Sequence, residues 1–161
     1  MRPAPVAKTV LIIDDYEDFV EALATMIRMH GQKPIAAITA LDGIRLAKVH
    51  CPDVIVLDIG LPGTNGYDVA TVLRRSFSLE KTLIVAVTGQ CDPFDEKRAV
   101  ESGFDLHCRK PLANNDIQKI LFLDRSVTRC AWKLHRREEK AAADNRVRLI
   151  KEIGESYGSD E

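Results

Sequence analysis

The sequence predicts a doubly wound α/β domain, in which helices cover both faces of an open parallel sheet. Strand-like and helix-like patterns alternate along most of the chain, and this alternation is typical of such a sheet. Four of the strand-like runs end in polar or charged residues, which are Asp14-Asp15, Asp58, Thr88 and Lys110. Because the carboxyl ends of parallel strands share one edge, we expect these side chains to lie close together.

Five segments have the character of strands in a parallel sheet. They are short, contain mainly apolar and β-branched residues, and are bounded by turn residues or charges. In chain order they are 10–13, 33–38, 54–58, 83–88 and 106–109. The strands that end at Asp14-Asp15 and at Asp58 are expected to be neighbours, at the point where the strand order reverses. Right-handed crossovers should join consecutive strands.

Helical spacing of apolar residues follows the first two strands. The segment 17–30 has a single apolar face, and Gly31 after it is a natural helix end. A second helix is expected to start from a Thr39 cap and to run to about Val49.

Three further helices are predicted after the later strands. The third spans 67–75. For the fourth, Asp92 is the expected N-cap and Pro93 the first-turn residue, and the helix ends at Ser102-Gly103. Asn114 to Asp116 open the fifth. Each strand is therefore followed by a helix, so the pattern comprises five βα units.

The three acidic residues at the expected sheet edge indicate a magnesium site. Carboxylates gathered closely repel one another and favour a cation between them. Magnesium prefers oxygen ligands, commonly one or two carboxylates with water and phosphate oxygens. We expect Asp15 and Asp58 to be direct ligands, Asp14 to act through a water, and the Gly60 carbonyl to complete the protein ligands.

The same residues indicate phosphoryl transfer. An aspartate carboxylate is a known covalent acceptor, which gives Asp58 this role. A positioned cation must offset the charge of the transferring group, and Lys110 is suited to this. The Thr88 hydroxyl could donate a hydrogen bond to a phosphoryl oxygen. Taken singly, each residue has an ordinary explanation as a cap, turn or strand residue, but their joint occurrence after successive strands favours the site.

These motifs resemble the receiver domain of two-component response regulators, over roughly residues 9–123. The matching segments are the acidic pair Asp14-Asp15, the acceptor segment 57–63, the helix entry 65–69, Val87-Thr88-Gly89, 101–105 and Lys110-Pro111. The resemblance implies a flavodoxin-like fold with strand order 2-1-3-4-5 and five helices. It also implies that a histidine kinase or a phosphotransfer protein donates a phosphoryl group to Asp58 with Mg²⁺ bound. The protein would then be a signalling phosphoacceptor, not an enzyme acting on other substrates.

The resemblance further implies a switch on phosphorylation. In the family, the threonine moves toward the acceptor and an aromatic residue of the fifth strand turns inward. Thr88 matches the threonine, whereas the aromatic position falls on His107, which departs from the usual Tyr or Phe. Gly60 and Gln90 occupy positions that often tune the lifetime of the phosphoryl group, and neither offers an acid or a base.

The remaining segments flank the predicted receiver domain. Residues 1–8 form an extension, and 124–161 form a basic helical tail that lacks the apolar content of a further effector domain. The fifth helix is expected to continue to about His135. Eight basic and three acidic residues lie between Arg125 and Arg148, which could meet an acidic partner, nucleic acid or an anionic membrane surface. Alternatively, these basic residues form a solvent-exposed helical face without a binding role.

Composition excludes several classes of protein. The chain has 161 residues with a formal net charge of -1, so the molecule as a whole is not an electrostatic nucleic-acid binder. No apolar stretch approaches the ~20 residues of a membrane span. The absence of an export signal and of paired cysteines favours the cytoplasm.

Three functions are consistent with the sequence. The first is a stand-alone response regulator that signals by protein contact, through the face formed by the fourth helix, fifth strand and fifth helix, with a homodimer as one form of contact. The second is a regulator that binds nucleic acid through Arg125, Arg129 and Lys133. The third is a magnesium-dependent phosphohydrolase, which Gly60 disfavours because it supplies no acid beside Asp58. The cognate kinase and the target are not specified by the sequence.

Overall fold

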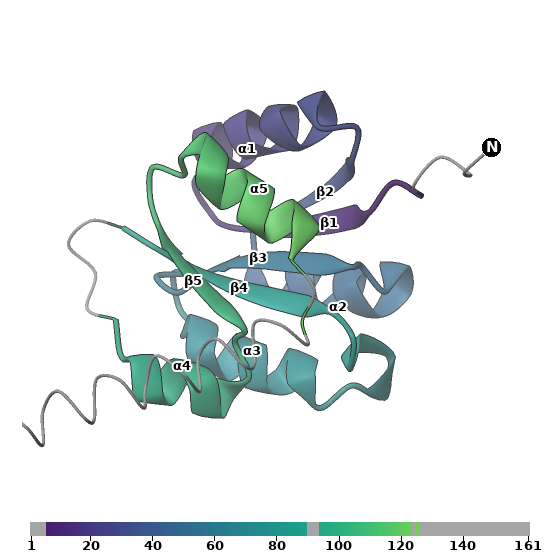
Figure 1. The fold of residues 1–161 in the computed structure, drawn as a ribbon. Coiled ribbons are helices and arrows are strands. Elements are labelled where there is room, and N and C mark those ends of the chain that lie inside the picture. Colours follow the sequence, from purple (N-terminus) through teal and green to yellow (C-terminus); the bar gives the residue numbers. More distant parts are fainter. Residues whose placement is uncertain (1–5, 90–93, 124, 126–161) are drawn as a thin grey trace, which may run out of the picture. The chain divides into compact units, whose positions relative to one another are not determined.

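In the computed structural model, a five-stranded parallel sheet forms the centre of the chain (Figure 1). The structure describes residues 6–89, 94–123 and 125, all of which belong to one compact unit, Met1–Arg125. The strand order is β2-β1-β3-β4-β5, and all neighbouring strands are parallel. The predicted doubly wound fold and its strand order are therefore confirmed.

Helices and strands alternate along the chain. The strands are β1 (Thr9–Ile13), β2 (Lys33–Ala37), β3 (Val54–Asp58), β4 (Leu83–Thr88) and β5 (Leu106–Arg109). The helices are α1 (Glu17–Met29), α2 (Ala40–His50), α3 (Gly66–Arg74), α4 (Glu96–Ser102) and α5 (Asn114–Phe122). A short 3₁₀ helix, η1 (Phe77–Leu79), precedes β4 and was not predicted.

The helices form a layer on each face of the sheet, as Figure 1 shows, with α1 and α5 on one side and α2, α3 and α4 on the other. Alternate residues of each strand serve the two layers because strand side chains point to opposite faces. Val10 and Ile12 of β1 pack in a cluster with Ile27 of α1 and Ile120 of α5. Every residue of β3 and β4 is buried, which explains why these strands are continuous apolar runs.

Helix ends agree with prediction at some places and differ at others. Thr39 caps α2, since its side chain accepts a hydrogen bond from the Asp42 backbone N–H. The N-cap of α4 is Asp95, whose side chain accepts from Arg98 N–H, so the prediction of a cap at Asp92 was wrong. Both residues are aspartates just before the helical pattern, and sequence spacing did not separate them. Residues 90–93 lie outside the described part of the chain.

The fifth helix is shorter than predicted. It ends at Phe122, and Leu123 has extended backbone angles (φ -73°, ψ 139°). An unbroken helix to about His135 is therefore excluded at Leu123, although the tail residues 126–161 lie outside the described part. The spacing of apolar residues predicted correctly which face of α5 is buried. This spacing does not indicate where a helix ends.

A buried charge network joins β5 to its surroundings. Asp105 is 3% exposed, and its carboxylate accepts hydrogen bonds from Arg74 at 2.7 Å, Arg125 at 3.0 Å and the Ile84 backbone N–H at 3.0 Å. Arg125 also donates to the Glu80 carbonyl. Arg125 therefore packs against the domain, contrary to its predicted place on a solvent-exposed basic stripe.

Removal of the Asp105 carboxylate should be costly. Asp105→Ala leaves the buried Ile84 N–H without this acceptor and deprives two guanidinium groups of their counter-charge. We expect the free energy of unfolding to fall by about 3 kcal/mol in urea titrations. Glu101→Ala, which breaks an exposed pair with Lys97, is the matched control and should cost less than about 1 kcal/mol. Equal effects of the two substitutions would contradict a structural role for the network.

Candidate functional site

The predicted acidic residues meet at the carboxyl edge of the sheet. Asp14 and Asp15 follow β1, and Asp58 is the last residue of the adjacent strand β3. One carboxylate oxygen from each of the three residues lies within 4.8 Å of the other two. Asp14 and Asp58 are 1% and 5% exposed, whereas Asp15 is exposed. Two of the three carboxylates that gather at this edge are therefore shielded from solvent.

The backbone around the acidic residues is fixed by local contacts. The Asp14 N–H donates to the Ala37 carbonyl of β2, and the Asp14 carboxylate accepts from the Tyr16 N–H at 3.0 Å. On the β3 side, Gly66 at the start of α3 packs directly on the strand end. A Cβ atom there would lie 2.6 Å from the Asp58 carbonyl oxygen, so only glycine allows this close approach.

Lys110 supplies the positive charge of the site. Its ammonium lies 2.5 Å from Asp14 Oδ2 and 3.5 Å from Asp58 Oδ1, and it contacts the Phe19 ring, 4.5 Å from the centroid. The backbone N–H of Lys110 donates to the Thr88 carbonyl, which places the lysine at the end of β5 beside β4. The predicted convergence of the strand ends on one site is therefore seen in the structure.

The pKa of Asp58 is raised above its usual range. Burial is the main cause, and the negative charge of Asp14 is the second. The Lys110 ammonium and a hydrogen bond from the Gly60 backbone oppose the rise without cancelling it. One cation between two buried carboxylates therefore leaves the site short of positive charge.

The donor atoms fit a hard divalent cation. Asp14 Oδ2 is buried and pairs closely with the Lys110 ammonium, 2.5 Å away. Three carboxylates that share one ammonium are suited to Mg²⁺, which takes oxygen ligands. The role of the Gly60 carbonyl as a ligand stays a prediction.

Thr88 and His107 lie side by side next to the acidic residues. The Thr88 hydroxyl, at the end of β4, is fully buried and forms a 2.9 Å hydrogen bond with Nε2 of His107 on β5. The His107 ring stacks on Phe94, with centroids 3.6 Å apart and planes at 7°. Burial and the positive charge of Arg109 lower the pKa of His107.

Sequence reasoning missed the aromatic residues near the site. Phe94 precedes α4, and Tyr67 in α3 forms a ring contact with it at 6.5 Å. Phe19 is near the start of α1, where it contacts Lys110. Phe19 and Phe94 belong to no motif, and Tyr67 lies in the helix-entry segment 65–69, which assigned it no role. The only available signal was position, since each lies just after a strand end of the predicted sheet.

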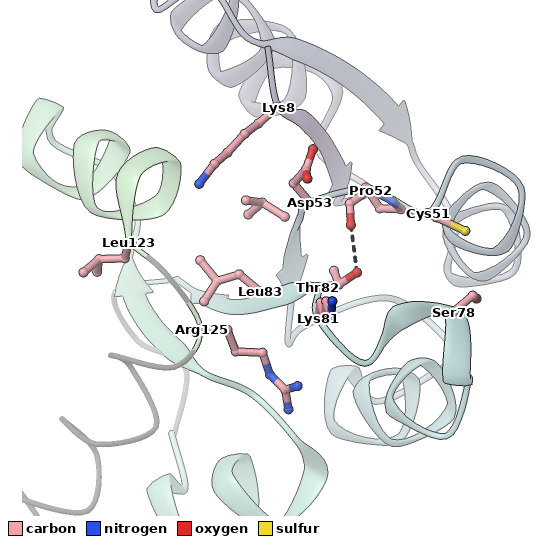
Figure 2. A pocket seen from close by; sticks show the side chains of 11 residues that line it. Lys8, Cys51, Pro52, Asp53, Ser78, Lys81, Thr82, Leu83, Leu123 and Arg125 are labelled. Atoms are coloured by element: carbon pink, nitrogen blue, oxygen red, sulfur yellow. Dashed lines mark hydrogen bonds between the residues drawn. The ribbon is translucent and has the colours of Figure 1, made fainter. Parts of the chain in front are cut away.

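The cavities in the described part of the chain include one beside the acidic site and one at the far edge of the sheet. One, of about 360 Å³, adjoins the site and is lined by Gly60, Tyr67, Phe94 and Arg98. The other, of about 250 Å³, lies at the opposite edge of the sheet, where strands β3 and β4 begin. Figure 2 shows Lys8, Asp53, Lys81 and Arg125 around this second cavity, none of them from the acidic site.

Fold and site together define the class of protein. The family model of the response regulator receiver domain matches residues 10–122. The chain therefore belongs to this family, whose members act in two-component signal transduction, and the resemblance seen in the sequence is confirmed. No described helix is long and apolar enough to cross a membrane.

Characterised relatives support the assignment. The chain is 32% identical over 107 residues to the transcriptional regulatory protein KdpE of Mycobacterium tuberculosis, a match that covers 66% of this chain and 46% of KdpE. It thus spans less than half the length of that relative. It is also 30% identical over 106 residues to the polar-differentiation response regulator DivK of Brucella abortus, a match that covers 66% of this chain and 86% of DivK.

Solved structures share the fold. A CheY-like receiver domain from Methylobacillus flagellatus has a TM-score of 0.65 at 25% identity, and the match covers 71% of this chain and 96% of that one. The chemotaxis response regulator CheY4 of Vibrio cholerae also has a TM-score of 0.65, at 19% identity, with coverage of 71% and 95%. At this identity, the similarity to CheY4 concerns the fold alone.

The raised pKa of Asp58 predicts how neutralising this residue affects stability. A carboxyl group whose pKa is higher in the folded than in the unfolded state destabilises the fold at pH values where it is ionised. Asp58→Asn should therefore increase the free energy of unfolding at pH 7 in the absence of divalent cations. The gain should shrink as the pH falls toward 4, where the wild-type carboxyl also becomes neutral.

Urea unfolding at several pH values tests this expectation. Asp53→Asn is a control at the far edge of the sheet, where the carboxylate accepts a hydrogen bond from the Thr9 N–H. That substitution should not stabilise the fold. A loss of stability in Asp58→Asn at pH 7 would contradict the charge imbalance inferred for the site.

Proposed function

We propose that the protein is a response regulator in which Asp58 accepts a phosphoryl group from a histidine kinase or phosphotransfer protein. The observation that supports this most is the position of the Asp58 carboxylate, at the end of β3 with the Lys110 ammonium 3.5 Å away and two further carboxylates beside it. A lone structural aspartate needs no such surroundings. An acceptor needs both a cation and a metal site.

The reaction is a displacement at phosphorus. A carboxylate oxygen of Asp58 forms the new P–O bond, while the P–N bond of the donor phosphohistidine breaks and the imidazole leaves with the electron pair. The raised pKa of Asp58 makes its oxygen more basic, and hence a better nucleophile once ionised. The Lys110 ammonium opposes this rise and favours the ionised form of Asp58.

Asp14, Asp15 and Asp58 are the residues that would hold Mg²⁺. When bound, the ion supplies positive charge for the phosphoryl oxygens. The three residues bring one carboxylate oxygen each within 4.8 Å of the others, which suits a shared cation. Lys110 neutralises a further oxygen, and the Thr88 hydroxyl donates to another. Together these groups match the charge of a phosphoryl group on a buried carboxylate.

The output is proposed to be protein contact through the face of α4, β5 and α5. Phe122 of α5 is 65% exposed on the described part of the chain, and His107 of β5 is half-buried beside Phe94. A change at Thr88 would reach this face directly through His107. A second copy of the chain is one candidate partner, and the cytoplasm is the proposed compartment.

A role in nucleic-acid binding receives less support. Of the three basic residues predicted for it, Arg125 pairs with Asp105 at 3.0 Å and donates to the Glu80 carbonyl. Its guanidinium is therefore committed within the domain. Arg129 and Lys133 lie outside the described residues.

Phosphorylation of Asp58 can be measured directly. We expect wild-type protein incubated with Mg²⁺ and acetyl phosphate to gain one phosphoryl group by intact mass, and Asp58→Asn to gain none. Mg²⁺ binding, followed as an increase in thermal stability, shows whether the site is intact. Wild-type protein that binds Mg²⁺ but accepts phosphate neither from acetyl phosphate nor from a panel of phosphorylated histidine proteins would refute the proposal.

Replacement of Lys110 should slow the reaction without removing the acceptor. Lys110→Met takes away the only cation that contacts Asp58 among the described residues, and the rate of adduct formation should fall roughly 10²-fold. Lys97→Met, on the exposed side of α4, is the matched control and should react at the wild-type rate. An unchanged rate in Lys110→Met would show that the lysine has no part in the transfer.

A further inference from the structure

His107 is a histidine at the place where related receiver domains usually have Tyr or Phe. Its Nε2 forms a 2.9 Å hydrogen bond with the Thr88 hydroxyl in the unmodified protein. A phenylalanine could not form this bond. A tyrosine hydroxyl extends farther from the strand and is always able to donate. A histidine nitrogen, in contrast, either donates or accepts according to its protonation.

The number of hydrogen bonds that the Thr88 hydroxyl can form limits its contacts with His107, both before and after phosphorylation of Asp58. A threonine hydroxyl has one proton to donate and two lone pairs with which to accept. In the unphosphorylated protein, Thr88 can donate this proton to a neutral His107 Nε2 or accept a hydrogen bond from Nε2–H. Both arrangements fit the observed distance of 2.9 Å.

A phosphoryl group on Asp58 removes one of these arrangements. When Thr88 donates its only proton to a phosphoryl oxygen, it can interact with His107 solely as an acceptor. Nε2 must then carry a proton. A neutral ring meets this requirement only as the Nε2–H tautomer, whereas the imidazolium form always meets it, and the positive charge of the imidazolium is attracted by the added negative charge of the phosphoryl group.

Phe94 holds the His107 ring in the geometry that this exchange needs. The two rings are nearly parallel, with centroids 3.6 Å apart, and Phe94 in turn contacts Tyr67. The Tyr67 hydroxyl accepts from the Asp95 N–H at the start of α4. The stack therefore fixes the plane of the imidazole and connects it to the first residues of α4. An aromatic face also tolerates a cation well.

The charges around His107 favour its neutral form in the unphosphorylated state. Arg109, on the same strand, is the nearest charge that affects the ring. On the α4 side, Arg98 lies over Tyr67, 4.5 Å from its centroid, and the Asp95 carboxylate accepts from the Arg98 N–H. On the β4 side the neighbour is the uncharged Thr88. Within the described ranges, no carboxylate forms an ion pair with His107.

We infer that His107 donates a hydrogen bond from Nε2–H to the Thr88 hydroxyl when Asp58 is phosphorylated, so that proton binding at His107 and phosphorylation at Asp58 favour each other. The inference rests on the proposed function, since it requires a phosphoryl group at Asp58. It makes the response of this regulator dependent on pH, through a residue that does not touch the phosphoryl group. His107 is thus a positioning residue that acts through Thr88.

The direction of the pH effect follows from linkage. The unphosphorylated protein has a His107 pKa below the usual value of 6.5, and phosphorylation raises it. As the pH falls from above both pKa values to below both, the phosphorylated state gains stability relative to the unphosphorylated one. Outside this interval His107 has the same charge in both states and contributes no pH dependence.

Histidine NMR of the whole chain tests the inference. Beryllium fluoride with Mg²⁺ serves as the probe, because it forms a stable mimic of a phosphoryl group on an aspartate. We expect the titration midpoint of His107 to rise by about one pH unit on binding, which corresponds to a tenfold linkage between the two events. Nitrogen chemical shifts should show a proton on Nε2 in the bound form. His107→Phe assigns the signal, and His50 on α2 serves as an internal control.

Two variants separate the hydrogen bond from a general effect of charge. Thr88→Val removes the hydroxyl that connects His107 to the site and should abolish most of the rise in the midpoint. His107→Phe keeps a ring that can stack on Phe94 but cannot donate. The ratio of wild-type to His107→Phe affinity for the probe should increase as the pH falls through the interval, and titration of Asp58 cancels in this ratio.

Each result decides the matter. If the probe binds and the His107 midpoint does not rise, or if Nε2 carries no proton in the bound form, the inference is wrong and the proposed function stands. An equal rise in Thr88→Val would also overturn it, because the coupling would then bypass the hydroxyl. If protein that binds Mg²⁺ is modified at Asp58 neither by the probe, nor by acetyl phosphate, nor by the panel of phosphorylated histidine proteins, the proposed function fails and the inference fails with it.

Discussion

The arrangement of the site depends on the ion pairs of Lys110 with Asp14 and Asp58. Both carboxylates are almost fully buried, and a buried charge without a partner is strongly unfavourable. The lysine comes from the end of β5, whereas the two aspartates follow β1 and β3, so a single ammonium joins three strands at one edge. It does not balance the charge fully. Burial, and after it the charge of Asp14, raise the pKa of Asp58 despite this cation.

The aromatic stack is the second element that organises this edge. It begins at His107, continues through Phe94 to Tyr67, and ends where Arg98 lies over the tyrosine ring. Strand β5 and helices α3 and α4 are thereby connected on the helix layer opposite α1 and α5. The stack runs from the half-buried His107 and Phe94 to Tyr67, which is 4% exposed and belongs to the core.

Much of this organisation was predictable from the sequence, for a physical reason. Buried parallel strands have distinctive apolar runs, and the residue that ends each run must lie at the carboxyl edge. Asp14, Asp58, Thr88 and Lys110 could therefore be assigned to one site from the sequence alone. The residues that were missed or misplaced lack such a constraint. Phe94 lies in a loop, Asp95 competes with Asp92 for the same cap, and the end of α5 depends on backbone angles at Leu123 that no apolar pattern encodes.

Lys110 lies closer to Asp14 than to Asp58. The ammonium is 2.5 Å from Asp14 and 3.5 Å from Asp58, so most of its charge compensates the carboxylate that does not react. Asp58 keeps a greater basicity as a result. A more basic carboxylate is a poorer leaving group, so an acyl phosphate of the kind proposed for Asp58 would lose its phosphoryl group to water more slowly. Under the proposed function, the position of the Lys110 ammonium between the two carboxylates would thus influence how long a phosphoryl group stays on Asp58.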